Sequence, residues 1–475
     1  MDKRKFYIGG TWVDPVRHQD LPVENPADGS TIATISIGSA ADVDRAVAAA
    51  KAAFRVWADT PPAERRALVE RLQNVYRRRY EEMARTISTE LGAPITMSRE
   101  QQADVGMGHA QGFLDSLERF HWEEQLANGD RLFREPVGVV GLITPWNWPM
   151  NQIALKVVPA LLTGCTCVLK PSEVTPLSAM LYAEMIHEAG FPPGTFNLVN
   201  GTGPDVGSAI SRHPDVAMVS FTGSTRAGSA VSRDAAETVK RVTLELGGKS
   251  PNLVFADCDV EERVSASVLE CFNNSGQSCD APTRMLVERQ VYDRAVEIAG
   301  QAGRRQAVGD PSEEGTHIGP LSSRLQWDRV QALIEAGVAE GAAVVAGGPG
   351  RPDGRPQGHY VRPTVFADVT PSMRVYREEI FGPVLTLTPF DSEEEGIALA
   401  NDTPYGLAAY VQSGDPGRVG RVARQLQAGM VHVNGAPHRY GSPFGGYKQS
   451  GNGREGGLQG LEDFVEIKVV HMPEV

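Results

Sequence analysis

The sequence has few cysteines and no pattern among them. There are five, an odd number, irregularly spaced along 475 residues. A disulfide-stapled secreted scaffold has many cysteines at regular spacing, so that class is excluded. Cys165 and Cys167 form a C-x-C pair, but no nearby His or Cys completes a metal site. We therefore expect no metal ion, and the pair is typical of a buried strand.

Long apolar runs are also missing. No stretch approaches the roughly 18 apolar residues of a membrane span. The charged N-terminus, MDKRKFYIGG, is not followed by the apolar core of a signal peptide. Basic residues number 46 against 59 acidic ones, so the formal net charge is -13, which argues against nucleic-acid and anionic-membrane partners. We expect a cytoplasmic protein.

The chain is too long for a single hydrophobic core, and its pattern of apolar and polar residues changes along its length. Residues 6–37 are typical of short strands and turns, and the periodicity predicts helices over 39–92 and 98–120. From residue 137, apolar runs such as VGVVGLIT, CTCVLK and VAMVSF alternate with helical segments. This alternation predicts right-handed βαβ units and a parallel sheet over 137–247, with a second α/β lobe over 248–447.

One thiol lies in an unusual loop. The segment NNSGQSCDAPTR (273–284) is rich in amides and small residues, and it contains Cys279. A free cysteine is most often a small buried hydrophobe, and the loop alone leaves that interpretation open. In TLELGGKSP (243–251), however, Glu245 ends an apolar run just before two glycines. A carboxylate facing a thiol could take its proton or activate water, which favours a nucleophile and its base.

Four polar or glycine-rich segments follow predicted strands: PWNWP (145–149), KPSE (170–173), FTGST (221–225) and ELGG (245–248). Ligands bind beyond the carboxyl ends of the strands in open parallel sheets. These segments are therefore expected to share one site.

The chain resembles the NAD(P)-dependent aldehyde dehydrogenase superfamily along nearly its whole length. The resemblance is carried by the segments above together with EEIFGPV (378–384) and PFGGYKQSGNGRE (443–455). It implies an α/β fold with a Rossmann-type cofactor domain (1–117 and 137–247) and an α/β catalytic domain (248–447). It also implies a small β oligomerisation element, with bridging segments at 118–136 and 448–475. In this family the tail and the hairpin near 118–136 pair across subunits, so a homodimer or homotetramer is expected.

The resemblance also implies the chemistry. Cys279 would attack a small aldehyde, and the side chain of Asn147 with the backbone N–H of Cys279 would hold the oxyanion. Glu245 would then activate the water that releases a carboxylic acid. Lys156 and Glu455 match positions that orient the base and the water.

Cofactor residues are implied at the strand ends and in EEIFGPV. Ser224 matches a phosphate contact at a helix N-terminus. Lys170 and Glu173 match ribose contacts, and a carboxylate there repels a 2′-phosphate, so NAD is expected with NADP as a weaker alternative. The full implied set is Thr144, Trp146, Lys170, Glu173, Gly223, Ser224, Glu379 and Phe381.

The match does not name the aldehyde. Leu155, His438 and Arg439 align with tunnel positions that vary within the family. Asp280 beside the nucleophile is a departure: it would raise the pKa of the thiol, or face the substrate and favour a polar or cationic aldehyde.

Three rival functions remain weaker. CoA-acylating relatives generally lack a glutamate at the position of Glu245. A cysteine hydrolase or acyltransferase would need a histidine base, and the glycine-rich motifs contain none. A non-catalytic descendant would have had no reason to keep Cys279, Glu245 and Asn147 together.

Overall fold

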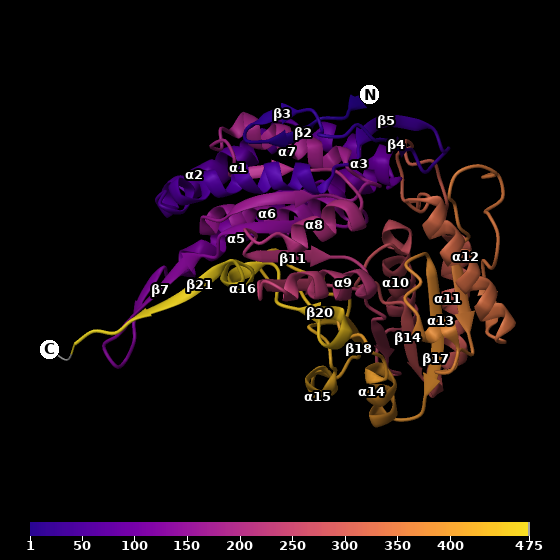
Figure 1. Cartoon of the computed structure of the whole chain (residues 1–475). Coiled ribbons are helices and arrows are strands. Elements are labelled where there is room, and N and C mark those ends of the chain that lie inside the picture. Colours follow the sequence, from indigo (N-terminus) through magenta and orange to yellow (C-terminus); the bar gives the residue numbers. More distant parts are fainter. Residues whose placement is uncertain (474–475) are drawn as a thin grey trace.

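The computed structural model describes residues 1–473, so the last two residues of the implied bridging segment 448–475 lie outside the described residues. Two large sheets, each covered by helices, form the body of the molecule, and a narrow β arm projects from it (Figure 1). The predicted α/β class is confirmed.

The first large sheet has eight strands in the order β20-β12-β11-β8-β9-β10-β2-β3. The five from β12 to β10 are mutually parallel, and the flanking strands are antiparallel. Their bounds are β2 Phe6–Ile8, β3 Thr11–Val13, β8 Val139–Ile143, β9 Thr166–Lys170, β10 Phe196–Leu198, β11 Met218–Thr222, β12 Arg241–Glu245 and β20 Gly451–Asn452. The parallel sheet expected over 137–247 is therefore present.

Strand β8 shows why the apolar runs become central strands. Val140 and Leu142 pack into one hydrophobic cluster, while Val139 and Ile143 pack into another on the opposite face. A strand covered on both faces needs apolar residues at every position, which is the pattern of the run.

Helices cover both faces of this sheet (Figure 1). They are α1 Ala40–Ala58, α2 Pro62–Arg78, α3 Tyr80–Leu91, α4 Ile95–Met97, the π-helix η1 Ser98–Gln102, α5 Asp104–Ser116, η2 Leu117–Arg119, α6 Pro149–Thr163, α7 Leu177–Ala189, η3 Gly203–Gly207, α8 Ser208–Arg212 and α9 Thr225–Ala236. Helix α6 starts with Pro149 in its first turn and ends at Gly164, whose φ of 94° suits glycine. A small separate sheet, β1 Asp2–Lys3, β4 Asp20–Glu24 and β5 Thr31–Ser36, has the order β1-β5-β4.

The second large sheet has seven strands in the order β15-β16-β17-β14-β13-β18-β19 and is parallel except for β15. The strands are β13 Pro251–Val254, β14 Arg284–Glu288, β15 Ala343–Ala346, β16 Thr364–Ala367, β17 Val384–Phe390, β18 Ala408–Gln412 and β19 Met430–Val433. The helices of this part are α10 Val260–Phe272, η4 Asn273–Gly276, η5 Arg289–Val291, α11 Tyr292–Arg305, α12 Arg324–Ala339, α13 Arg374–Arg377, α14 Glu393–Asn401 and α15 Pro416–Gln425. This is the second α/β lobe that the sequence predicts.

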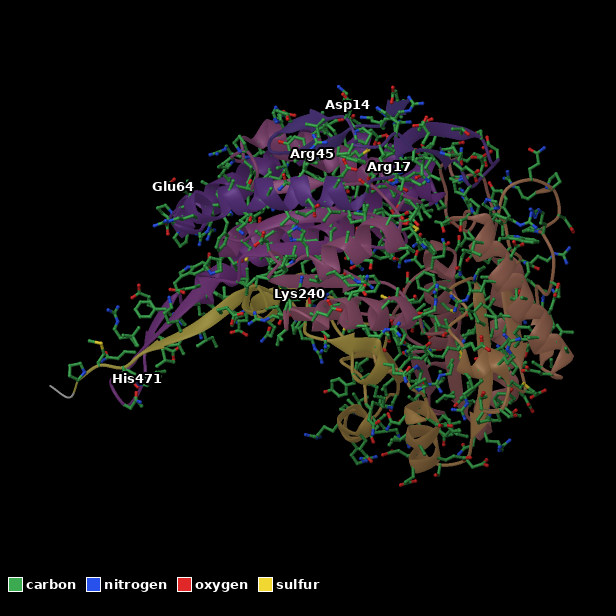
Figure 2. The ribbon with its side chains drawn as sticks, in the orientation of Figure 1. Asp14, Arg17, Arg45, Glu64, Lys240 and His471 are labelled. Atoms are coloured by element: carbon green, nitrogen blue, oxygen red, sulfur yellow. The ribbon has the colours of Figure 1, made fainter. Side chains whose placement is uncertain are left out.

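The arm is a three-stranded antiparallel sheet of β6 Glu123–Gln125, β7 Arg131–Pro136 and β21 Val465–Val470, in the order β21-β7-β6. The tail and the hairpin near 118–136 therefore pair with each other within one chain, and their pairing across subunits stays a prediction. Six residue pairs, from Val465–Pro136 to Val470–Arg131, align β21 with β7, so one edge of the tail strand is paired. The tip, where the ring of His471 contacts Asp130 at 2.9 Å, lies far from the body (Figure 2).

The tail segment also reaches the body. The helices η6 Lys448–Ser450 and α16 Gly457–Glu462 flank β20, which pairs with Leu244 and Glu245 at the end of β12. The same stretch of sequence thus forms both a sheet edge next to the candidate site and part of the arm.

Candidate active site

A strained loop positions the thiol of Cys279. After α10 ends, Asn274, Ser275 and Gly276 have φ values of 51°, 57° and 72°. Left-handed backbone is costly for residues other than glycine, so it persists only where surrounding contacts enforce it. A Cβ at Gly276 would lie 2.1 Å from the carbonyl oxygen of Gly382, so the two chain segments approach as closely as glycine allows.

The amide of Asn147 is fixed beside this loop. It is 3% exposed, and its Nδ2 donates to the carbonyl of Gln277 at 3.0 Å. In return, Asn274 Nδ2 donates to the Asn147 carbonyl at 2.8 Å, and Trp148 Nε1 donates to Ser278 Oγ at 2.8 Å. An amide NH₂ has two hydrogens, so one N–H of Asn147 stays available beside the nucleophile.

Glu245 ends β12 and points its carboxylate into a confined space. The residue is 4% exposed, and neither carboxylate oxygen has a hydrogen-bond partner among the described residues. Burial and then the charge of Glu455 raise the pKa of Glu245 well above its usual range. A Cβ at Gly445 would lie 2.6 Å from Oε1, so glycine there leaves the carboxylate its room.

A buried ion pair lies behind Glu245. Lys156 Nζ pairs with Glu455 and also donates to Ser220 Oγ at 3.0 Å. The positive charge of Lys156 lowers the pKa of Glu245, in opposition to Glu455. The charges of Lys156 and Glu455 therefore act on the pKa of Glu245. Both residues lie next to the base, as the sequence predicts.

The thiol of Cys279 is half-buried and holds its proton at neutral pH. Its pKa is raised well above the usual value, first by burial and then by the charges of Asp280, Glu245 and Glu379. A thiol in this environment needs a base to become a nucleophile.

One cavity of about 140 Å³ brings most of the sequence-predicted residues together. Its wall includes Trp146, Asn147, Gly223, Ser224, Glu245, Cys279, Glu379 and Phe381. Thr144, Lys156, Lys170, Glu173 and Glu455 are not part of this wall. Lys156 and Glu455 form the ion pair described above. The other three lie at the ends of neighbouring strands, where Thr144 N donates to the Lys170 carbonyl at 3.1 Å and Lys170 Nζ contacts Glu173 at 3.1 Å.

The cavity wall has features that fit a dinucleotide. Ser224 is the N-cap of the twelve-residue helix α9, and its Oγ accepts from Ala227 N at 3.3 Å. The exposed N–H groups of such a helix end attract phosphate. Glu379 Oε1 accepts from Gly248 N at 3.0 Å, and a Cβ at Gly247 would lie 2.4 Å from Glu379 Oε2.

Two aromatic rings meet across the same wall. Trp146 and Phe381 pack edge to face, with centroids 5.4 Å apart and planes at 87°. Phe381 has a φ of 60°, a left-handed conformation that sets the direction of its ring.

Comparison with known proteins assigns this site to a family. The model of the aldehyde dehydrogenase family matches residues 12–470. The chain belongs to the aldehyde dehydrogenase family. A 3-succinoylsemialdehyde-pyridine dehydrogenase from a Pseudomonas species is 50% identical over 470 residues, covering 99% of this chain and 98% of that protein.

Two crystal structures of aldehyde dehydrogenases have nearly the same fold. The enzyme from Bartonella henselae gives a TM-score of 0.98 at 52% identity, covering 99% of each chain. Aldehyde dehydrogenase C of Pseudomonas syringae, a mutant in complex with NAD+ and octanal, gives 0.97 at 50% identity, covering 98% of this chain and 96% of that one. The predicted family, fold and enzyme class are thus confirmed, while the roles of individual residues stay predictions.

Some residues of this aldehyde dehydrogenase site escaped the sequence reasoning. The wall also includes Pro145, Thr222, Leu246, Gly247, Gln326 and Arg329. The first four lie inside the motifs PWNWP, FTGST and ELGG, which the sequence placed at the site without singling out these residues. Gln326 and Arg329 belong to α12, whose sequence has no motif that points to a ligand.

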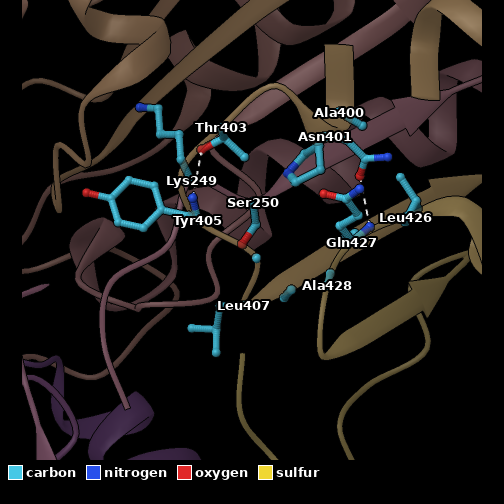
Figure 3. Close-up of a pocket in the computed structure, with 14 residues that line it drawn as sticks. Lys249, Ser250, Ala400, Asn401, Thr403, Tyr405, Leu407, Leu426, Gln427 and Ala428 are labelled. Carbon is cyan, nitrogen blue, oxygen red and sulfur yellow. Dashed lines mark hydrogen bonds between the residues drawn. The ribbon is translucent and has the colours of Figure 1, made fainter. Parts of the chain in front are cut away.

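A second cavity, lined by Lys249, Ser250 and residues near 400–409 and 426–428, is much smaller (Figure 3). It measures about 10 Å³, which is space for about one water molecule. Lys249 lines it with 1% exposure, its Nζ has no partner among the described residues, and burial lowers its pKa to about 7. The cavity is too small for a substrate of an aldehyde dehydrogenase, so we assign it no catalytic role.

Two kinds of feature are absent from the part of this aldehyde dehydrogenase that the structure describes. Within residues 1–473, no three His, Cys, Asp or Glu side chains are grouped so as to hold a metal ion. Over the same range, none of the helices combines the length and apolarity needed to cross a bilayer.

Proposed function

We propose that this protein oxidises an aldehyde to a carboxylic acid with NAD, using Cys279 as the nucleophile. The observation that carries the proposal is the single cavity that contains Cys279, Asn147 and Glu245 together with the residues that fit a dinucleotide. The complex of Pseudomonas syringae aldehyde dehydrogenase C with NAD+ and octanal supports the same reaction class.

The first step is attack of the Cys279 sulfur on the aldehyde carbon. Glu245 accepts the thiol proton, because both of its oxygens are free and burial raises its pKa, which makes it a stronger base than an exposed carboxylate. A C–S bond forms and the carbonyl π pair moves to oxygen. The free N–H of Asn147 and the backbone N–H of Cys279 hold that anion, a contribution of about 3 kcal/mol in comparable oxyanion holes.

NAD, when bound, supplies the acceptor for the hydride that the thiohemiacetal must lose to become a thioester. The chain's own residues hold it. Ser224 and the N-terminus of α9 would hold the pyrophosphate, and Glu379 and Phe381 would hold the nicotinamide end. Lys170 and Glu173 would bind the adenosine ribose, where the carboxylate would disfavour a 2′-phosphate and leave NADP as the weaker alternative.

Glu245 releases the thiol proton to solvent before hydrolysis and then acts a second time as a base. It takes a proton from water, the resulting hydroxide adds to the thioester carbon, and the C–S bond breaks to release the acid and the thiolate. Lys156 and Glu455 are positioning residues here, because their charges act on the proton affinity of Glu245.

We also propose the division of labour along the chain. Residues 1–117 and 137–247 form the cofactor domain, 248–447 the catalytic domain, and 118–136 with 448–475 the bridging and oligomerisation segments.

Support for a homodimer or homotetramer comes from β21, where Ile467, Val469 and Val470 are 62%, 42% and 39% exposed. An Ile467→Lys variant should shift the mass measured by light scattering toward the monomer. An unchanged mass would contradict a role for β21 in assembly. A cytoplasmic location stays a prediction.

The test is NADH appearance with a panel of aldehydes, for wild type and for Cys279→Ala. Cys258→Ala is the matched control, because Cys258 is also a half-buried free thiol but lies outside the cavity. We expect turnover to vanish in the first variant and persist in the second. Glu245→Gln should slow both proton transfers. Turnover by Cys279→Ala, or turnover that requires added CoA, would refute the proposed mechanism.

A further inference from the structure

A third cavity, of about 250 Å³, lies on the far side of the nucleophile loop. Cys279 lines the cofactor cavity, and the next residue, Asp280, lines this one. Its wall also contains Glu270 from α10, Tyr410 and Gln412 from β18, and His432 from β19. The two cavities are therefore lined by consecutive residues of one loop, which places the third cavity next to the nucleophile.

Several hydrogen-bond donors around this cavity are already engaged within the protein. Tyr410 Oη donates to the Asp280 carbonyl at 3.1 Å, and Gln412 Nε2 donates to Asn252 Oδ1 at 3.0 Å. Arg263 Nη1 donates to the carbonyl of residue 434 at 2.6 Å, and its Nη2 pairs with the carboxylate of residue 262 at 3.0 Å. These donors are not available to a ligand.

The acceptors, by contrast, are free. Gln412 is 2% exposed, yet its Oε1 has no partner among the described residues. His432 Nδ1 lies 2.9 Å from the carbonyl of Ala436, so in the neutral ring this nitrogen carries the proton and the unpartnered Nε2 presents a lone pair. Within residues 1–473, neither Asp280 nor Glu270 forms a hydrogen bond through its carboxylate or an ion pair at 4.0 Å or less.

The negative charges of the cavity wall, like its free acceptors, favour a cationic ligand. Burial and then the neighbouring charge of Asp280 raise the pKa of Glu270, while His432 lowers it, so the two carboxylates lie close enough to act on each other. Burial lowers the pKa of His438, so that wall residue is neutral at pH 7. A buried acceptor without a partner is costly, and two close carboxylates favour a cation.

We propose that this cavity binds the protonated amino end of the substrate, so that the preferred substrate is a short aldehyde with a primary ammonium group. The inference rests on the proposed function, because the carbonyl end must reach Cys279. Asp280 and Glu270 supply the negative charge, and Gln412 Oε1 and His432 Nε2 accept the N–H bonds. A plain alkyl chain would leave all four acceptors unpaired.

The experiment compares kcat/KM for 4-aminobutanal, 4-(trimethylammonio)butanal and pentanal. The second compound has the charge without N–H groups, and the third has neither. We expect wild type to rank them in that order. Glu270→Gln should lower the ratio of 4-aminobutanal to pentanal by about tenfold, mainly through KM, because a hydrogen bond to a charged group contributes about that factor. Glu394→Gln, which removes an exposed carboxylate on α14 outside the cavity, is the matched control.

The outcomes separate the two proposals. If wild type prefers pentanal, or if Glu270→Gln leaves the ratio unchanged, the amino-end site is refuted while the dehydrogenase function stands. A preference for the trimethylammonium compound would refute the role of the acceptors. Gln412→Met provides a second check, because it removes the acceptor without changing charge and should lower kcat/KM for 4-aminobutanal more than for the trimethylammonium compound. If no aldehyde yields NADH, both proposals fall.

Discussion

Replacing Glu455 by glutamine should lower the pKa of Glu245 and move the pH dependence of turnover to lower pH. The charge of Glu455 raises the pKa of Glu245, and Lys156 lowers it. Because Glu455 has the larger influence of the two, removing its charge lowers the pKa whether or not Lys156 keeps its full effect. The glutamine can still accept from Lys156 Nζ, so the local packing is retained.

The size of the shift follows from the burial of both carboxylates. Glu245 is 4% exposed and Glu455 is 6% exposed, so solvent screens their repulsion weakly. Unit charges roughly 6–8 Å apart at an effective dielectric constant of about 20 interact by about 2–3 kcal/mol, or about 1.5–2 pKa units. The ionised base is needed for hydrolysis, so the acid limb of the profile should move down by up to that amount.

The assay is stopped-flow NADH formation between pH 5 and 10. It separates the first turnover, which reports acylation, from the steady state, which includes hydrolysis. Glu462→Gln is the control, because Glu462 is an exposed carboxylate on α16, close in sequence to Glu455. An acid limb that stays in place or moves to higher pH would refute the electrostatic role of Glu455.

Three further predictions concern the nucleophile loop, a buried carboxylate and cofactor choice. In Gly248→Ala, the new Cβ would lie 2.4 Å from the carbonyl oxygen of Cys279, so kcat should fall by on the order of 100-fold; an unchanged kcat would contradict the close approach. Glu90 accepts the N–H groups of the first two residues of α7, and burial raises its pKa to about 7. Between pH values of about 4.3, the pKa of the unfolded carboxyl, and about 7, the native state binds one more proton than the unfolded state. As the pH rises through that window, the free energy of unfolding of the wild type should fall by roughly 3–4 kcal/mol. Glu90→Gln should lack this loss, and parallel Tm curves from pH 4.5 to 8 would refute the assignment. Glu173→Gln should lower the preference for NAD over NADP by about tenfold, read from the two kcat/KM values. An unchanged ratio of the two kcat/KM values would show that Glu173, although it contacts Lys170, does not distinguish the 2′-hydroxyl of NAD from the 2′-phosphate of NADP.

The parts that the sequence predicts well are those where one short segment determines its own environment. The run VGVVGLIT becomes β8 because every residue in its centre is apolar, and alternate side chains do enter different clusters. Asn147, Glu245 and Ser224 reach one cavity because each follows a parallel strand of one sheet, and such ends meet along a single edge.

The remaining features depend on contacts between distant segments. Strand β20 has only two residues, Gly451–Asn452, and no strand pattern; it forms because β12 offers a free edge there. Gln326 and Arg329 enter the cofactor cavity through the packing of α12, which no local pattern reveals. The pairing of β21 with β7 joins residues more than 300 positions apart, and a sequence can show that an edge needs a partner without showing which one.

The three carboxylates around the nucleophile explain why activation depends on one of them. Burial first, and then the charges of Asp280, Glu245 and Glu379, raise the pKa of the Cys279 thiol, so the resting thiol is protonated. The protonated form resists oxidation but cannot attack. Asp280 lines the neighbouring cavity, and Glu379 Oε1 is engaged by Gly248 N. Glu245 alone among them lines the thiol's cavity with both oxygens unpartnered in the described structure.

The proton transfer from Cys279 to Glu245 therefore has two effects in the same direction. It creates the thiolate, and it removes the negative charge of Glu245 that had opposed thiolate formation. The reverse transfer restores that charge and returns the thiol to its protonated form. Since Lys156 and Glu455 act on the proton affinity of Glu245, they also act on the nucleophile, although neither lines its cavity. A single buried carboxylate, balanced by one ion pair, thus couples the protection of the thiol to its activation.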